Sequence, residues 1–548
     1  MVRDLRLLAD TTFDVLVVGA GIYGAAAAWD AAQRGLSVAV IDRGDFGSGT
    51  SFNNLKTVHG GLRSLQSLNF RQMRLFIRER RALARLVPHL VRPLPFIVPT
   101  YRDPRRSSLL MRLALAINDA VSRDRHEGIA DPSRHLPPGA IVSREECLQL
   151  SPAVDPGGVT GGAVWYDYQM HNTDRVTLAF LLSATDAGAV GANYLEATGF
   201  LTDAGRVTGV AAVDRLGGGT LDIRARVVLN AAGPWAGALL ASLPDGGPPT
   251  PAPRLSLAMN LVTRPVARTH ACGGIADGRF LFLVPWRDVS ILGTSHEAHD
   301  GGPDALEVTR WDLEALLADA RKAFPHANLT AADVRLIHRG LLPMVSGHEH
   351  HVRLLRESAV IDHRRTKLAG LVSMFGVRYT TARKTAADAV DAVFAQLGAA
   401  TPPPCRTAEL PLVGGAIGHY GNFERAVLLR AVPGMPAEAL GRLAGSYGTA
   451  YDAVLQIVRD RPELAAPLGR RCQVTGAEIL HAARGEMAMK LGDAVLRRTE
   501  AGSAGHPGTD ALEAAAAIMA PERGWDEWQA RNEVAEVEGW YQRMASPQ

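Results

Sequence analysis

Residues 13–42 read FDVLVVGAGIYGAAAAWDAAQRGLSVAVID, and this stretch decides the fold. The run 13–19 is mostly apolar and ends in glycine, a pattern typical of a buried parallel strand. Residues 22–34 are rich in alanine, lack proline and stop at Gly35, so they predict a helix with a glycine cap. Residues 37–42 predict a second strand. Together these segments predict a βαβ unit.

Gly19, Gly21 and Gly24 form a GxGxxG pattern where the first strand passes into the helix. Gly19 permits a tight turn, Gly21 lets a pyrophosphate approach the backbone, and Gly24 lets the helix pack closely on the strand. The helix N-terminus adds partial positive charge. Asp42 ends the second strand, where a carboxylate binds the ribose hydroxyls of an adenosine. We therefore predict a dinucleotide site, with a glycine turn that binds nothing as the alternative.

The length and composition are those of an ordinary globular protein. The 548 residues suffice for two to four domains, 47% are apolar and 21% are charged. With 59 basic and 56 acidic side chains, the net charge of +3 gives no field that would favour nucleic acid as a partner.

Neither cysteines nor histidines predict a metal site. The cysteines lie far apart without a CxxC pair, which excludes a disulfide framework or a standard zinc site and suits a reducing compartment. They are Cys147, Cys272, Cys405 and Cys472. Residues 348–351 (HEHH) lack helical ligand spacing, so we interpret them as a loop and expect no metal.

The rest of the chain divides by composition. Residues 70–130 look helical and rich in arginine, and residues 159–230 break into short β segments with glycine turns. The run TPPP at 401–404 is a stiff linker, because a proline run cannot continue a helix. Residues after 422 show apolar positions at helical spacing. We therefore expect an α/β part, a β-rich part and a helical C-terminal part.

Residues 43–63 (RGDFGSGTSFNNLKTVHGGLR) are dense in Gly, Ser, Thr and Asn, as a chain needs to be when it runs along a long cofactor. Here the sequence resembles the FAD-dependent glycerol-3-phosphate dehydrogenase family, within the D-amino-acid-oxidase-like flavoproteins. The resemblance rests on DFGSGTS at 45–51, LKTVHGGLR at 55–63, RARVVLNAAGPWA at 224–236 and FGVRYTTARKTA at 375–386. It extends to residues 477–498 and so covers nearly the whole chain.

The resemblance implies an α/β (α+β) fold with a Rossmann-like FAD-binding domain, an inserted β-rich substrate domain and an all-helical C-terminal domain. The oxidoreductase region would span 12–400. Its FAD-binding segments would be about 12–90, 175–260 and 340–400, and its substrate-domain segments about 91–174 and 261–339. Residues 401–421 would form the linker and residues 422–548 the helical domain.

The resemblance also implies which residues contact FAD. Gly19, Gly21, Gly24 and Asp42 would hold the adenine half. The other implied contacts are Ser48, Thr50 and Ser51 at the pyrophosphate and ribityl chain, Lys56, His59 and Gly60 near the flavin ring, Ala232 and Gly233 at a second adenine-side turn, and Gly376, Thr380 and Thr381 over the pyrimidine end. For each Ser, Thr and Lys, simple loop solvation is the alternative.

The implied reaction is the oxidation of glycerol 3-phosphate, or a similar polyol phosphate, to dihydroxyacetone phosphate or the matching ketone. It needs a hydride acceptor, a base for the hydroxyl proton and cations for the phosphate. His59 is our preferred base because imidazole titrates near neutral pH; a packed core histidine is the alternative. Arg63 is the candidate partner of the phosphate, with an internal salt bridge as the alternative.

Four positions depart from the family pattern, all at the substrate end. Ser64 stands where the family has tyrosine, Leu342 where it has a substrate-phosphate arginine, and His296 where it has aspartate. Arg378 replaces a lysine and keeps its charge, so it remains a candidate catalytic residue.

Leu342 leaves the substrate open. Arg339 and His338 could supply a compensating charge, although neighbouring side chains on a strand point to opposite faces. An apolar residue in place of arginine favours instead a flavin oxidase or dehydrogenase of a non-phosphorylated alcohol or amine. A scaffold without activity is a third alternative, against which the retained Lys56 and His59 argue.

The resemblance implies that electrons pass to a membrane quinone and that the protein is cytoplasmic and peripheral on the inner face of the cell membrane. Oxygen as acceptor is the alternative, and a homodimer is an open alternative to a monomer. The sequence contains no run of about 18 uncharged apolar residues, so it predicts no membrane-spanning helix. Residues 1–21 lack the long apolar core of a secretion signal. Residues 105–118 (RRSSLLMRLALAIN) could lie on lipid, or could form an amphipathic helix packed on the protein.

Overall fold

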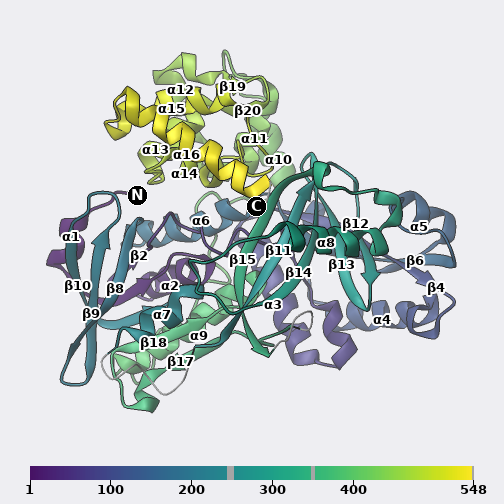
Figure 1. Ribbon diagram of the computed structural model, residues 1–548, viewed down its shortest axis with the longest axis horizontal. Coiled ribbons are helices and arrows are strands. Elements are labelled where there is room, and N and C mark those ends of the chain that lie inside the picture. Colours follow the sequence, from purple (N-terminus) through teal and green to yellow (C-terminus); the bar gives the residue numbers. More distant parts are fainter. Residues whose placement is uncertain (244–251, 347–351, 546–548) are drawn as a thin grey trace.

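The computed structural model describes residues 1–243, 252–346 and 352–545. Two large sheets lie side by side, and the C-terminal helices cover them from above (Figure 1). The expected fold class is confirmed, and the predicted loop at 348–351 lies outside the described residues. Within the described residues no helix is long and apolar enough to cross a membrane, and no cluster of metal-binding side chains occurs.

The predicted βαβ unit forms the centre of the first sheet. It consists of β1 (Thr12–Val18), α2 (Ile22–Gln33) and β2 (Val38–Ile41), with β1 and β2 parallel. The sheet order is β17-β18-β10-β1-β2-β7, and the hairpin of β8 and β9 continues from β10. The bounds are β7 Val190–Ala192, β8 Leu195–Asp203, β9 Arg206–Asp214, β10 Thr220–Asn230, β17 Ala359–Asp362 and β18 Leu371–Phe375.

Three helices cover one face of this sheet: α2, α6 (Thr173–Asp186) and α9 (Ala382–Gln396). The alanines of α2 at 25–28 are fully buried, and these small side chains let the three helices pack closely on one another and on the sheet. Trp29 of α2 fills the remaining space and meets Phe180 of α6 edge to face at 5.6 Å. The core that positions the GxGxxG turn is therefore built from small residues around one large one.

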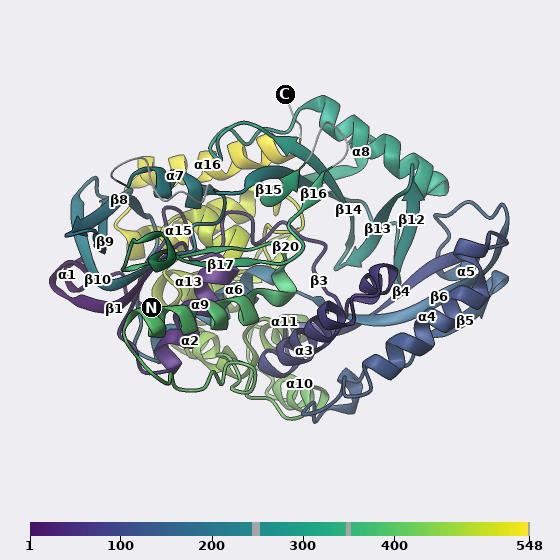
Figure 2. The same ribbon diagram turned by 90° about the horizontal axis from the view of Figure 1, so that it is seen from below.

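The second sheet runs in the order β16-β15-β11-β14-β13-β12-β4-β6-β3, with β5 beside β6. Helix α8 (Arg310–Ala323) lies along its outer side (Figure 2). The bounds are β3 Thr57–Val58, β4 Val91–Tyr101, β5 Ala140–Ser143, β6 Val159–Met170, β11 Arg254–Thr263, β12 Ala271–Ala276, β13 Arg279–Trp286, β14 Val289–His299, β15 Val334–Ser346 and β16 Arg353–Leu354.

Two local expectations need correction. The domain limits expected near 260 and 340 fall inside β11 and β15, which pair with each other, and these limits stay a prediction. Within 70–130, residues 91–101 form the strand β4 rather than helix. The prolines at 93, 95 and 99 all occupy odd-numbered positions of the strand. The even-numbered residues between them can therefore form the backbone hydrogen bonds to β6. Within 159–230, residues 173–186 form the helix α6.

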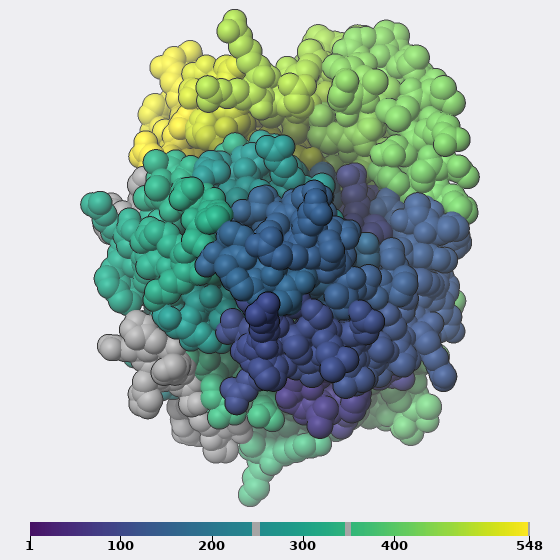
Figure 3. All heavy atoms as spheres, turned by 90° about the vertical axis from the view of Figure 1, so that its right-hand side faces the viewer, coloured from purple at the N-terminus to yellow at the C-terminus, as the bar shows by residue number. Residues whose placement is uncertain are grey.

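The C-terminal part is helical apart from one short hairpin of β19 (Pro467–Gly469) and β20 (Cys472–Thr475), which the sequence analysis did not predict. Its helices are α10 Tyr420–Leu428, α11 Ala437–Tyr447, α12 Tyr451–Asp460, α13 Gly476–Gly485, α14 Leu491–Asp493, α15 Thr509–Arg523 and α16 Glu527–Ala545. In the space-filling view these residues form a continuous layer along the top of the molecule (Figure 3).

Gly24→Ala tests the close packing of α2 on β1. A Cβ at this position would overlap the Gly19 carbonyl oxygen, so we expect the free energy of unfolding to fall by about 1–3 kcal/mol. Urea unfolding followed by circular dichroism measures it. Gly421→Ala is the matched control, because a Cβ there meets nothing within 4 Å and helix propensity favours alanine. Equal stability of Gly24→Ala and the parent would contradict the packing argument.

Candidate active site

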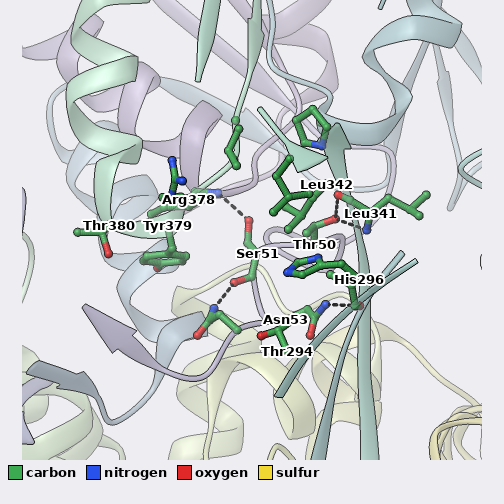
Figure 4. Close-up of a pocket in the computed structure, with 18 of the residues that line it drawn as sticks. Thr50, Ser51, Asn53, Thr294, His296, Leu341, Leu342, Arg378, Tyr379 and Thr380 are labelled. Atoms are coloured by element: carbon green, nitrogen blue, oxygen red, sulfur yellow. Dashed lines mark hydrogen bonds between the residues drawn. The ribbon is translucent and has the colours of Figure 1, made fainter. Parts of the chain in front are cut away.

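A cavity of about 1860 Å³ lies between the two sheets. Gly19 and Asp42 form one end, and the loop that carries His59 and several strands of the second sheet form the other. In Figure 4, Thr50 and Ser51 lie in its middle, between residues 378–380 and the second sheet. The volume exceeds the roughly 300–1,000 Å³ of ordinary small-ligand pockets, so the cavity has room for an extended ligand.

The glycine turn brings the ends of β1 and β10 together. Gly19 has a φ of +99°, and a Cβ on it would lie 2.6 Å from the Ala231 carbonyl oxygen. The Ala231 N–H donates to the Val18 carbonyl at 2.8 Å. Ala232 and Gly233 follow directly and border the cavity, which is the location expected for the second turn.

The Asp42 carboxylate joins two loops at the end of β2. It accepts hydrogen bonds from the Ala20 N–H at 2.7 Å and from the Gly44 N–H at 3.0 Å. Burial raises its pKa to about 6. The side chain borders the cavity beside Gly19, where a carboxylate could reach ribose hydroxyls.

Ser51 packs against the first turn of α2. Its Oγ accepts a hydrogen bond from the Ile22 N–H at 2.9 Å, and a Cβ on Gly21 would lie 2.9 Å from the same oxygen. Because the first N–H groups of a helix lack intrahelical partners, this turn offers donors and partial positive charge to an anionic group in the cavity.

The loop from Thr50 to Asn53 is fastened to the second sheet. Thr50 Oγ1 donates to the Leu341 carbonyl at 3.1 Å and accepts from the Leu341 N–H at 3.2 Å. Asn53 donates to the Ala258 carbonyl at 2.8 Å. These bonds fix the distance between the dinucleotide turn and the strands that face it (Figure 4).

Nothing in the sequence analysis pointed to Tyr23, yet it organises one wall of the cavity. Its hydroxyl accepts from the N–H groups of Val377 and Arg378, both at 3.0 Å, and donates to the Arg378 carbonyl at 2.8 Å. A Cβ on Gly376 would overlap its ring, so only glycine fits there. Tyr23 therefore ties the GxGxxG turn to the loop 376–381.

Most of the predicted cofactor residues border the cavity. They are Gly19, Gly21, Asp42, Ser48, Thr50, Ser51, His59, Ala232, Gly233, Gly376 and Thr380. Lys56 and Gly60 lie behind the wall, and their expected place near the flavin ring stays a prediction. Lys56 is 1% exposed, and its Nζ donates to the Phe52 carbonyl at 2.6 Å. The Gly60 N–H donates to the Asp167 carboxylate at 2.6 Å. Gly24 and Thr381 are likewise absent from the cavity wall.

His59 borders the cavity and is exposed to it, which argues against a packed core histidine. Its Nε2 lies 2.9 Å from Thr57 Oγ1. Desolvation is the largest cause that lowers the pKa of His59 below its usual 6.5, and the charges of nearby arginines act in the same direction. Asp167 acts in the opposite direction but is itself paired with Arg80. The imidazole is therefore neutral at pH 7 and able to accept a proton.

Arg63 and Arg378 border the same end of the cavity as His59. Arg63 is exposed, and in the described part of the chain it makes no ion pair, so the internal salt bridge considered for it is not present. The guanidinium of Arg378 lies 5.5 Å from the centre of the Phe76 ring and donates to the Arg356 carbonyl. Both cations are thus placed to face a ligand.

Arg279 and Arg356 also border the cavity, and neither was predicted from the sequence. Arg279 begins β13 and pairs with Asp319 at 2.5 Å, and Arg356 follows β16. No motif marked them, because their position depends on strands that are distant in sequence. His296 of β14 also borders the cavity, and desolvation and the charge of Arg63 lower its pKa to about 4.

The expected compensating residues are not at the cavity. Leu342 borders it, as does Leu341, whereas Arg339 and His338 do not. His338 is 3% exposed and packs between the rings of Phe52 and Trp286, at 5.3 and 6.5 Å. Any compensation for the arginine missing at position 342 must therefore come from other segments of the chain, such as those that carry Arg63 and Arg378.

The fold and this cavity define a dinucleotide-binding protein of the α/β class. The family model described as "FAD dependent oxidoreductase" matches residues 14–384, and the model "C-terminal domain of alpha-glycerophosphate oxidase" matches residues 405–530. The chain belongs to the FAD-dependent oxidoreductase family.

Named relatives match over the whole chain. It is 27% identical to a glycerol-3-phosphate dehydrogenase of Synechocystis, covering 100% of this chain and 99% of the relative. It is 31% identical to glycerol-3-phosphate dehydrogenase 2 of Mycobacterium bovis, covering 97% and 88%. The structure of glycerol-3-phosphate dehydrogenase from Bacillus halodurans complexed with FAD superposes with a TM-score of 0.77 at 26% identity, covering 98% and 96%.

The residues at the cavity fit FAD, the cofactor of this family. The N–H groups at the start of α2 suit the pyrophosphate, Asp42 suits the ribose, and the cavity continues past Ser51 to His59, where the ring has room. Any side chain larger than that of glycine at position 21 would enter the space beside Ser51 that suits the pyrophosphate.

Gly21→Val should abolish FAD retention. The added Cβ would come within 2.9 Å of Ser51 Oγ, and its methyl groups would block the approach of the pyrophosphate to the backbone. The measurement is the ratio of absorbance at 450 nm to that at 280 nm in purified protein. Ala25→Val on the buried face of α2 is the control for a general packing defect. A Gly21→Val protein with full flavin content would contradict the assignment.

Proposed function

We propose that this protein oxidises glycerol 3-phosphate to dihydroxyacetone phosphate. The observation that supports it most is the pair of cations Arg63 and Arg378, which border the cavity and whose charges act on the neutral imidazole of His59. Such a group suits a phosphate ester, because guanidinium groups bind phosphate through paired hydrogen bonds. The names of the relatives support the same substrate.

In this proposal the chain's own residues bind and orient the substrate and remove one proton. Bound FAD supplies the hydride acceptor. Arg63 and Arg378 hold the phosphate, which leaves the secondary hydroxyl toward His59. With Nε2 engaged by Thr57, the Nδ1 of His59 takes the hydroxyl proton.

A second candidate is the oxidation of a non-phosphorylated alcohol or amine. It is favoured by Leu341 and Leu342, which give the cavity an apolar stretch on β15. The two candidates differ in whether the cations near His59 contact the substrate.

Anaerobic bleaching of the flavin distinguishes these candidates. We expect glycerol 3-phosphate to bleach the 450 nm band and unphosphorylated glycerol to leave it unchanged. Arg63→Met should raise the concentration needed for half-maximal bleaching rate by at least about tenfold, since a charged hydrogen bond contributes roughly 1.5–3 kcal/mol. Bleaching by neither compound in a protein loaded with FAD would refute the proposed substrate.

His59→Ala should keep FAD and slow its reduction by about 10²- to 10⁴-fold, the usual scale of acid–base catalysis. In the parent, the reduction rate should be constant near pH 7 and fall at lower pH, because the protonated imidazole cannot accept the proton. The midpoint should lie below 6.5, since the pKa of His59 is lowered. Stopped-flow absorbance measures the reduction rate of the variant and the pH dependence of the rate of the parent. His299→Ala is the control, because His299 lies outside the cavity wall. Unchanged kinetics would remove His59 from the mechanism.

We further propose a peripheral membrane location with quinone as the electron acceptor. Helix α4 (Ser108–Val121) has a single buried residue, Leu115, and its leucines 109, 110 and 113 are 78%, 44% and 58% exposed. Arg105 and Arg112 flank this apolar face. Leu110 and Met111 also border the cavity, so a quinone bound at this helix would approach the flavin end.

Binding to vesicles of phosphatidylglycerol and phosphatidylcholine tests this location. The double variant Leu109→Glu/Leu113→Glu should bind at least about tenfold more weakly, because burial of one leucine contributes about 1.5–3 kcal/mol. Leu429→Glu is the control, since that leucine is equally exposed but lies after α10. Cosedimentation measures binding, and equal losses in both variants would contradict a role for α4.

A further inference from the structure

The C-terminal domain reaches into the first sheet through a buried ion cluster. Arg498 is 1% exposed and donates to both oxygens of the Asp45 carboxylate, at 2.6 and 2.7 Å. Arg497 donates to the same carboxylate at 2.5 Å and to Asp493 at 2.7 Å. In Figure 1 the C-terminal helices lie above α6 and β2, and Asp45 belongs to the loop that follows β2.

Asp45 belongs to the loop that runs along the cofactor cavity. Its carbonyl accepts from the Ser48 N–H at 3.1 Å, which closes a tight turn, and Ser48 borders the cavity. Within that turn the Gly47 N–H donates to the Ala20 carbonyl at 3.1 Å, inside the GxGxxG motif. A displacement of Asp45 would therefore move both the loop and its contact with the glycine turn.

A second contact connects the same domain to the opposite wall of the cavity. Arg175, in the first turn of α6, pairs with Glu486 at 2.7 Å and donates to the Arg498 carbonyl at 3.2 Å. The neighbouring Thr173 carbonyl accepts from the Tyr379 hydroxyl at 3.0 Å. Tyr379 lies on the loop 376–381, so this loop is connected to the same cluster of the C-terminal domain indirectly, through the first turn of α6.

We infer that the C-terminal domain is a structural part of the FAD site, and that Arg498 is a positioning residue for FAD acting through Asp45. The paired charges hold the loop 44–51 in the shape that the cofactor needs, so the loop is ordered before FAD arrives. Since the docked domain favours FAD, bound FAD must favour the docked domain by the same factor. This inference concerns FAD binding and does not depend on which substrate the enzyme oxidises.

The test uses Arg498→Met and the double variant Asp45→Asn/Arg498→Met in the full-length holoenzyme. Dissociation of FAD is followed by the recovery of free flavin fluorescence after dilution, and thermal unfolding is measured on the same samples. Arg442→Met is the matched control, because Arg442 also makes a largely buried ion pair, with Glu478 at 2.8 Å, but within the C-terminal domain.

We expect the single variant to bind FAD about 10- to 100-fold more weakly, the scale seen when a partner that orients a bound group is removed. It should also melt at a lower temperature, because it leaves a buried carboxylate short of its partner. The double variant lacks the Asp45 carboxylate, so no buried charge is left without its partner. Its melting temperature should therefore return toward that of the parent, while its affinity for FAD should stay low. If the single variant does not fold, FAD dissociation from the double variant tests the inference.

Two results would overturn the inference. One is FAD binding within twofold of the parent in Arg498→Met. The other is recovery of FAD binding together with stability in the double variant, since the loss would then arise from the unpaired charge and not from the lost anchor. The reciprocal effect has its own readout: removal of FAD from the parent should speed amide hydrogen exchange at residues 493–500, and unchanged exchange would also count against the coupling.

Discussion

The rest of the structure depends on the packing of several chain segments around the first turn of α2. Ser51 bonds to the Ile22 N–H, Ala231 packs against Gly19, and the Tyr23 hydroxyl holds the backbone of 377–378. At each of these three contacts, one of the residues that meet must be glycine or must have a short side chain. The glycines of the motif therefore serve the protein's own packing as much as the cofactor, because three loops distant in sequence can meet at the helix N-terminus only where no Cβ intervenes.

This convergence also connects the two sheets. The loop that starts at the glycine turn continues through Thr50 and Asn53 and bonds to β15 and β11 of the second sheet. One short segment thus touches the dinucleotide turn and the substrate-facing strands. A ligand that spans the cavity therefore contacts segments of both sheets, whose apolar residues also share one core cluster.

The sequence predicted the parts that local patterns control. The βαβ unit, the three glycines, Asp42 and the helical C-terminal part follow from periodicity and from steric rules that act within about 30 residues. Strand β4 was missed because its three prolines resemble a break, and helix α6 because it lies between strands. Tyr23, Arg279 and Asp45 were missed for another reason. Their roles depend on partners such as Arg378, Asp319 and Arg498, which only the folded topology brings within reach.

The substrate end was the hardest to predict because it is defined by charges that lack partners. Several buried arginines elsewhere are neutralised by carboxylates, such as Arg383 by Glu79 and Arg175 by Glu486. Near His59, by contrast, Arg63 makes no ion pair in the described part of the chain, and Arg378 contacts a carbonyl and a ring. Arg63 and Arg378, which make no ion pair among the described residues, repel one another, and this repulsion costs free energy until an anion joins them. The cavity therefore favours an anionic ligand even with Leu342 in its wall, because the positive charge comes from the loops at 63 and 378 and not from β15.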